Sequence, residues 1–303
     1  MAGKFKLACT KGKPQLRVSF ITQVSCCPQR GAILLFLAVF LSSSGCAFLS
    51  PSQPVPSPSA PTTLAPQLLA SLDTRRQALT SLRGLARVVY SDPQEKGTAK
   101  QAIAVAVPNH FRLELFSPIG IALLTACDGN TLAAYFPQEK AMYRGSATPF
   151  NIARFIRIPL SSHDITGLLL GLPVLPAHGE AGAARVDPHT GWYQLNLTFS
   201  GYETHSLWFE QKDLLLMRWE VRTNDGTVLS RVILADYRKV NGQYFPFEIV
   251  LSDMQEKQEA AIYYERVELN PRLSDSLFTL RPIPGVQEID VDTFSGEQRV
   301  GVF

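Results

Sequence analysis

The spacing of hydrophobic residues changes along the chain, and its first clear period is helical. Between residues 67 and 83, four leucines recur at helical spacing, with Arg75 in the same stripe. This pattern predicts one amphipathic helix that ends at Gly84. Residues 50–66, just before it, are rich in proline and serine. Because proline lacks a backbone N–H and fixes φ, this stretch is expected to form an extended tether.

After residue 84 the chain consists of short and often alternating apolar runs separated by turn residues. Asp128-Gly129, Asn224-Asp225-Gly226 and Asn241-Gly242 are typical hairpin turns. Regular short strands with such turns between them indicate an antiparallel sheet. The pattern predicts eleven strands, over residues 85–91, 98–107, 111–116, 121–127, 131–136, 192–199, 204–209, 214–223, 228–237, 244–251 and 259–268. From Asn270 onward, prolines and a glycine predict a tail that runs over the surface.

Two short helices are expected to interrupt the strands, over residues 150–158 and 162–171. Pro149 precedes the first helix, Pro159 follows it, and Pro173 follows the second. A large curved sheet has a concave face that is either filled by side chains or covered by helices above an apolar cavity. The inserted helices are apolar enough to act as a lid, but composition does not separate these two arrangements. The predicted fold class is mainly β with α, with an N-terminal helix and about eleven antiparallel strands.

The N-terminal part resembles a bacterial lipoprotein signal. Residues 33–41 form a short apolar run that is followed by Ser43-Ser44-Gly45-Cys46. The run is too short to cross a bilayer comfortably and has the length of a signal-peptide core. We expect residues 1–45 to be the signal, Cys46 to carry lipid, residues 46–66 to be the tether, and residues 67–303 to form one domain. The alternatives are an uncleaved membrane anchor and an ordinary cleaved signal.

Charge and cysteine content agree with an exported protein that does not bind nucleic acid. The chain has 29 Lys and Arg against 26 Asp and Glu, a net charge of +3. Six of the basic residues and none of the acidic ones precede Cys46, which leaves 23 basic against 26 acidic residues in the expected mature protein. That balance gives no sign of a nucleic-acid surface. Only Cys127 remains after Cys46, so no internal disulfide is available, and Cys127 is expected to be a small buried apolar residue.

Two phrases carry a resemblance to a known family. Residues 115–124 read LFSPIGIALL, and residues 158–173 read IPLSSHDITGLLLGLP. In order and separation they resemble the motifs of LolB, the family of outer-membrane lipoproteins that receive other lipoproteins from the periplasmic carrier LolA. The resemblance covers residues 67–269. It departs from the LolB pattern in its longer tether, its extended C-terminal tail and an ending closer to that of LolA-type domains.

The resemblance implies an unclosed antiparallel half-barrel with a lid of helices over an apolar cavity. It also implies that Ile119, at the tip of the Pro118-Ile119-Gly120 loop, enters the membrane, although a hairpin residue packed under a neighbouring loop is the alternative. Ile119 stands where LolB has leucine. The residues expected to form the lid and line the cavity are Phe155, Ile156, Ile165, Leu168, Leu169, Leu170 and Leu172.

The function implied is non-enzymatic and needs no cofactor. The protein is expected to lie on the periplasmic face of the outer membrane, to accept acyl chains of lipoproteins from a LolA-like carrier, and to pass them to the membrane. The alternative is a lipid-anchored scaffold, or a binding protein for another hydrophobic ligand, with the same fold. A third possibility is a surface-anchored hydrolase.

Two groups of polar residues contain the side chains of possible chemical sites. Ser161-Ser162-His163-Asp164 contains the residue types of a hydrolytic triad, but triad members converge from separate elements, and Ser162 is expected to cap a helix. No catalytic residue is therefore assigned. A second group in a loop lacks the helical spacing that would hold two metal ligands on one face, so no metal site is assigned. Its members are His178, Glu180, Asp187 and His189.

Overall fold

The computed structural model describes residues 63–199 and 203–293. All of them belong to the unit Pro54–Phe303. The expected signal, the expected lipidation site at Cys46 and residues 46–62 of the expected tether lie outside the described residues.

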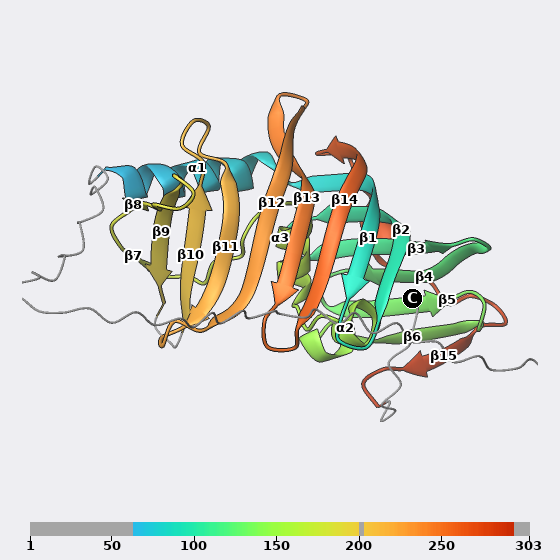
Figure 1. Cartoon of the computed structure of the whole chain (residues 1–303). Coiled ribbons are helices and arrows are strands. Elements are labelled where there is room, and N and C mark those ends of the chain that lie inside the picture. The colour runs from blue at the N-terminus through green and yellow to red at the C-terminus, as the bar shows by residue number, and fades with distance from the viewer. Residues whose placement is uncertain (1–62, 200–202, 294–303) are drawn as a thin grey trace, which may run out of the picture. The chain divides into compact units, whose positions relative to one another are not determined.

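The described chain is built around one large sheet, which confirms the expected fold class (Figure 1). Its strand order is β15-β6-β5-β4-β3-β2-β1-β14-β13-β12-β11-β10-β9-β7, and β8 also pairs with β9. All pairings are antiparallel except the parallel pair β15 and β6. The chain thus runs outward from β1 to β6 on one side, crosses over, and returns to the other side of β1 through β14.

The strands are β1 (Ser81–Ser91), β2 (Lys96–Ala106), β3 (His110–Ser117), β4 (Gly120–Cys127), β5 (Thr131–Phe136), β6 (Ala141–Ser146), β7 (Glu180–Ala181), β8 (Arg185–Val186), β9 (Tyr193–Thr198), β10 (Glu203–Phe209), β11 (Leu216–Thr223), β12 (Val228–Val240), β13 (Gln243–Asp253), β14 (Gln258–Leu269) and β15 (Gln287–Asp290). The helices are α1 (Leu64–Ala78), α2 (Pro149–Ile156), α3 (Ser162–Leu169) and the 3-10 helix η1 (Asp275–Phe278).

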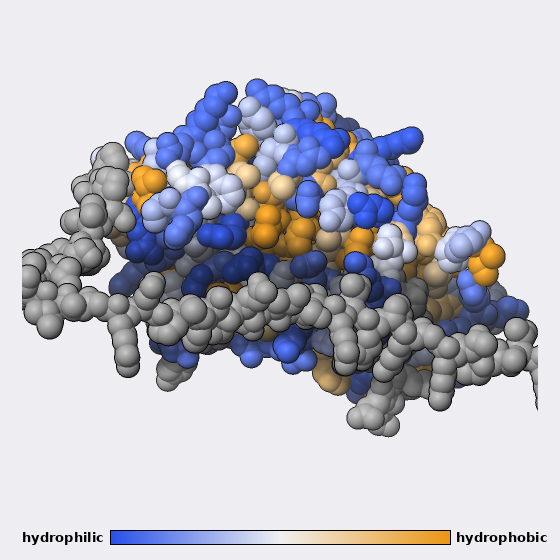
Figure 2. Space-filling model, viewed as in Figure 1, coloured by the Kyte–Doolittle hydropathy of each residue, from blue (hydrophilic) through white to orange (hydrophobic). Residues whose placement is uncertain are grey.

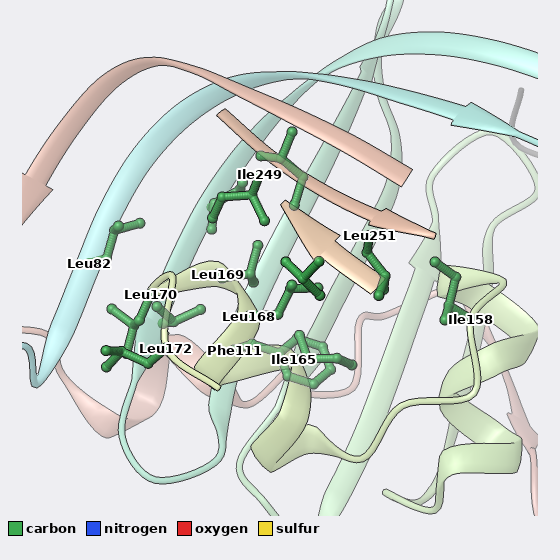
Figure 3. Close-up of a cluster of buried hydrophobic side chains, with 14 of the residues drawn as sticks. Leu82, Phe111, Ile158, Ile165, Leu168, Leu169, Leu170, Leu172, Ile249 and Leu251 are labelled. Atoms are coloured by element: carbon green, nitrogen blue, oxygen red, sulfur yellow. The ribbon is translucent and has the colours of Figure 1, made fainter. Parts of the chain in front are cut away.

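The concave face of the sheet carries the main core. Side chains alternate along each strand, so every second residue of a strand points to the same face. In β13, Phe245, Phe247, Ile249 and Leu251 are all buried. The helices α2 and α3 lie over this face, and Figure 3 shows Leu168 and Leu169 of α3 among the side chains of Ile249 and Leu251. The outer face of the same strands is partly apolar, and hydrophobic residues gather over β12–β14 in Figure 2.

The N-terminal helix differs from its prediction at both ends. It begins at Leu64 and ends at Ala78, and the strand β1 already contains Gly84. Pro66 is tolerated because it lies in the first turn, where its missing N–H has no intrahelical partner. Gly84 serves a close contact between strands instead of ending a helix. A Cβ at this position would lie 2.9 Å from the carbonyl oxygen of Arg266 and 3.3 Å from the ring of Tyr264.

Four strands were not predicted, and the C-terminal segment is more ordered than expected. The strands β7 and β8 have two residues each, and β6 has the weakly patterned sequence AMYRGS. Residues 275–290 pack on the sheet. Phe278 is buried, and the Arg112 guanidinium donates to the carbonyl oxygen of Leu277 at 3.2 Å. The strand β15 then completes the sheet beside β6. These partners are distant in sequence, so local pattern does not reveal them.

Candidate functional site

An apolar cavity of about 100 Å³ lies between the concave face of the sheet and the helices α2 and α3. Its walls come from β1–β4, β13 and β14 on the sheet side, and from both helices and the loop between them. Leu113, Leu115 and Leu123 are typical of the sheet side. Of the two arrangements that the sequence left open, the structure therefore has the one in which helices cover the sheet and leave a cavity.

Five of the seven predicted lid residues line this cavity, and two do not. The five that line it are Phe155, Ile156, Ile165, Leu168 and Leu169. Leu170 and Leu172 lie beyond the C-terminal end of α3, on the side of Leu82 (Figure 3). Leu170 is fully buried in the core, whereas Leu172 lines a second cavity. The predicted helix over residues 162–171 included Leu170 and ended just before Leu172, but α3 ends at Leu169 and Gly171 adopts a positive φ of 68°.

Each helix of the lid begins at a side-chain cap. Thr148 accepts a hydrogen bond from the backbone N–H of Asn151 at the start of α2, where Pro149 follows the cap. Ser161, and not Ser162 as expected, caps α3 in a capping box with Asp164. The Asp164 carboxylate thus holds the helix start, and His163 is exposed.

Hydrogen bonds attach α3 to the sheet and to the helix α1. The hydroxyl of Tyr264 in β14 donates to the carbonyl oxygen of Leu169 at 2.9 Å. The Thr166 hydroxyl lies 2.9 Å from the carbonyl oxygen of Ser162 in its own helix and 3.3 Å from that of His110 in β3. The Arg76 guanidinium donates to the carbonyl oxygen of Pro173 at 2.8 Å. Complete burial raises the pKa of the Tyr264 phenol, so this donor keeps its proton at neutral pH.

The helix α2 is attached through its two ends. At its start, the Asn151 amide donates to a carboxylate oxygen of Asp292 at 2.6 Å. At its end, Arg157 adopts a positive φ of 70°, and its guanidinium donates to Glu95 at 2.9 Å in the turn between β1 and β2. The helix α2 is therefore attached next to the edge strand β15 at its start and to the turn between β1 and β2 at its end.

A second cavity of about 440 Å³ adjoins the first. Leu160, Leu168 and Leu251 line both cavities, so these side chains separate the two spaces. The second cavity is lined by β10–β13 and by the end of the lid, and four of its lining residues other than Trp219 carry polar side chains. They are Asp164, Glu203, His205 and Ser230.

His205 was not singled out by sequence reasoning. Its side chain is 7 % exposed, and neither ring nitrogen has a hydrogen-bond partner within residues 63–199 and 203–293. Burial lowers the pKa of His205, while the carboxylates of Glu203 and Asp164 oppose that shift. The imidazole is therefore neutral at pH 7. One signal was present, because His205 alternates with Leu207 and Phe209 and so falls on the core face of its predicted strand.

The structure places Ile119 at the tip of the turn between β3 and β4, where it is 80 % exposed. Pro118 precedes it, and Gly120 follows it with a φ of 121°, a conformation that favours glycine. The Ser117 hydroxyl closes the turn by donating to the carbonyl oxygen of Gly120 at 3.0 Å. None of the helices in the described ranges is long and apolar enough to cross a membrane.

Of the polar loop residues, Asp187 has structural contacts, whereas His178, Glu180 and His189 are exposed. Asp187 accepts from the indole N–H of Trp208 at 3.0 Å and from the backbone N–H of His189 at 2.9 Å. Within residues 63–199 and 203–293, no three His, Cys, Asp or Glu side chains form a group that could hold a metal ion. Cys127 is buried, which confirms its expected placement, and burial raises the pKa of its thiol to about 11.

Comparisons with known proteins identify the fold. A family model described only as an uncharacterized protein matches residues 195–284, and no curated protein sequence matches significantly. Among solved structures, a domain from Vibrio parahaemolyticus described under outer membrane lipoprotein sorting has a TM-score of 0.52 at 10 % identity, covering 72 % of this chain and 97 % of that one.

Two further solved structures are similar over the same extent. A DUF1329 family protein from Desulfovibrio piger has a TM-score of 0.52 at 14 % identity, covering 73 % of this chain and 98 % of that one. A LolA superfamily protein from Nitrosomonas europaea has a TM-score of 0.49 at 15 % identity, covering 73 % and 99 %. The chain thus has a fold like that of outer membrane lipoprotein-sorting domains: a large, unclosed and mostly antiparallel sheet whose concave face is covered by short helices.

Proposed function

We propose that the protein binds an acyl chain between the concave face of its sheet and the helices α2 and α3. The observation that carries this proposal is the cavity between these elements, whose walls are mostly apolar apart from Tyr90, Gln101, Thr125 and Arg157. Burial of apolar surface is the dominant gain when such a chain leaves water. The similarity of the fold to lipoprotein-sorting domains supports the same reading.

The size of the cavity decides how such a chain enters. A dry apolar cavity of about 150 Å³ accommodates one benzene ring, and the cavity here has about 100 Å³. A long acyl chain therefore requires the lid helices to move away from the sheet. The hydrogen bonds of Tyr264 and Arg157 hold the lid against the sheet, and they are those that loading exchanges for ligand contacts.

The finer proposal is a LolB-like role. The protein, anchored through lipid on Cys46 at the periplasmic face of the outer membrane, accepts lipoproteins from a LolA-like carrier and uses Ile119 to place their acyl chains in the membrane. The exposure of Ile119 on a tight turn supports this role, because the side chain has no core to enter. Depletion of the protein is then expected to leave newly made lipoproteins in the inner membrane or the periplasm. Unchanged lipoprotein location would overturn the delivery role and leave ligand binding intact.

A second candidate is a lipid-anchored binding protein for a smaller hydrophobic ligand, without a transfer role. The volume of about 100 Å³ favours it, because a small ligand fits without displacement of α3. The two candidates differ in their dependence on chain length. Acyl-chain transfer requires affinity that rises with each methylene added, whereas a small closed site loses affinity once the ligand exceeds the space.

Competition against a fluorescent polyene fatty acid tests acyl binding. Leu123 points into the cavity, and its neighbour Leu124 is buried on the opposite face. We expect Leu123→Phe to fill the cavity and lower affinity for the probe about tenfold, a loss of roughly 1.4 kcal/mol, and Leu124→Phe to leave it unchanged. Mass spectrometry of lipid extracted from the purified protein provides a second readout. Equal effects of the two variants would place the ligand outside this cavity.

A further inference from the structure

Among the described residues, the imidazole of His205 packs edge-on against the ring of Phe199 but has no hydrogen-bond partner. Its side chain is 7 % exposed, and neither ring nitrogen makes a hydrogen bond. The nearest carboxylate oxygen, from Glu203, lies 3.9 Å from Nε2, beyond hydrogen-bond distance. Buried polar groups almost always have partners, because an unmade hydrogen bond costs stability. A buried imidazole that breaks this rule and lines a cavity calls for a partner from outside the chain.

The surroundings of His205 decide what that partner can be. Asp164, on the lid, and Glu203, at the start of β10, line the same cavity. The Glu203 side chain is 52 % exposed and marks the end of the cavity that is open to solvent. Ser230 adds a hydroxyl from β12. No Lys or Arg is among the described residues that line this cavity. A carboxylate or phosphate group that enters this second cavity meets two negative charges, whereas Arg157, which lines the first cavity, is paired with Glu95.

A neutral imidazole offers one N–H donor and one acceptor nitrogen. It is therefore matched by a group that both donates and accepts, such as a hydroxyl or an amide. The rest of the cavity is apolar, with Val221 and Val232 on the sheet side and Leu172 and Val174 on the lid side. Its inner end reaches Leu160, Leu168 and Leu251, which also line the first cavity.

We propose that the two cavities form one site for an amphiphile, in which His205 binds an uncharged head group carrying hydroxyl or amide groups while the acyl chain extends past Leu168 into the first cavity. This inference rests on the proposed acyl-chain binding and adds the class of head group. The site selects uncharged acyl esters and amides over free fatty acids and phosphate-bearing lipids of the same chain length.

Calorimetric titration of the full chain with two probes of equal chain length tests the inference. The probes are monolauroylglycerol, which carries hydroxyls, and laurate, which carries a carboxylate, each below its micelle-forming concentration. We expect the wild-type protein to bind monolauroylglycerol about tenfold more tightly than laurate. His205→Leu removes both nitrogens and is expected to lower this ratio by weakening the binding of monolauroylglycerol, while Asp164 and Glu203 still disfavour laurate. Glu203→Gln removes a negative charge and is expected to improve laurate binding.

The matched control is Ser206→Ala. Ser206 is the next residue of β10, is buried, and points to the opposite face of the sheet, so its loss is expected to leave the ratio unchanged. A purely structural His205 predicts that His205→Leu melts at a lower temperature. A ligand-binding His205 predicts an equal or higher melting temperature, because the replacement removes a buried group without partners.

The outcomes separate this inference from the proposed function. Binding of both probes with equal affinity, unaffected by His205→Leu, would overturn the head-group assignment and leave acyl-chain binding standing. Absence of binding by either probe would overturn both. A preference for laurate would show that the negative charges do not govern the site, and would also overturn the inference.

Discussion

The hydroxyl of Tyr264 donates to the carbonyl oxygen of Leu169 at 2.9 Å and so fastens the last turn of the lid helix α3 to the middle of the sheet. Both groups are buried, and Tyr264 also packs edge-on against Phe245 at 5.3 Å between ring centroids. Opening of the lid at this point breaks a hydrogen bond in a dry environment, where such bonds are strongest.

Tyr264→Phe is expected to loosen the lid. It removes the hydroxyl and keeps the ring, which leaves a buried carbonyl oxygen without this donor at a cost of about 1–3 kcal/mol. We expect a lower free energy of unfolding in urea and faster association of an acyl probe in stopped-flow fluorescence. Tyr263→Phe is the matched control, because Tyr263 lies on the outer face under Arg87. Faster association in both variants would show that ligand entry does not depend on the hydrogen bond between Tyr264 and Leu169.

Ile119→Glu is expected to weaken attachment to lipid and leave the fold intact. The side chain is 80 % exposed, so its replacement removes little core packing, whereas its transfer into lipid contributes roughly 1.5–3 kcal/mol. Flotation with liposomes measures the bound fraction, and thermal unfolding checks the fold. Met254→Glu is the control, since Met254 is an exposed apolar residue that follows β13 in the turn to β14. A large drop in melting temperature for Ile119→Glu would make Ile119 a packing residue instead.

Gly84→Ala is expected to destabilise the centre of the sheet. The added Cβ meets the Arg266 carbonyl oxygen at 2.9 Å, and backbone atoms do not move aside cheaply. We expect a loss of about 1–3 kcal/mol, the usual cost of forcing a methyl group into a packed site. Gly182→Ala is the control, because its nearest atom would lie at an ordinary contact distance of 3.5 Å. Chemical denaturation of both variants measures the difference, and equal stabilities would show that β1 and β14 separate at this point.

The pH dependence of stability is expected to carry a contribution from His205. Its pKa in the folded protein lies below the unfolded value of 6.5, so the unfolded state binds more protons between these two values. Stability therefore rises with pH through this window and is constant above it. The free energy of unfolding is measured at about pH 5 and about pH 8. We expect the change between these two values to be smaller for His205→Leu than for the wild type. If the free energy of unfolding changes with pH by the same amount in both proteins, the imidazole is hydrated in the folded state.

The strands and lid helices followed from local signals. Hairpin sequences such as Asn241-Gly242 and prolines such as Pro149 act within a few residues, and the structure confirms the turns and the two helices that they predicted. The N-terminal helix was extended too far because Leu79 and Leu82 kept the helical period by coincidence, while both are buried beyond the helix end.

What the sequence did not reveal depends on distant partners. Phe278 is buried because the 3-10 helix η1 packs against the outer faces of β3 and β4. The strand β15 forms only by pairing with β6, which lies more than a hundred residues earlier in the chain. His205 belongs to the same class. Its chemical interest comes from the absence of a partner, which only the packed structure establishes for the residues described.

The pairing of β15 with β6 has a consequence for association between molecules. An unpaired strand exposes a row of backbone N–H and C=O groups on which another chain can add a strand. At one end of the sheet, β15 has only four residues, and at the other, β7 has only two. Removal of residues after Asn270 uncovers the longer β6, so proteolytic trimming at the C-terminus is expected to promote strand addition between molecules at this edge.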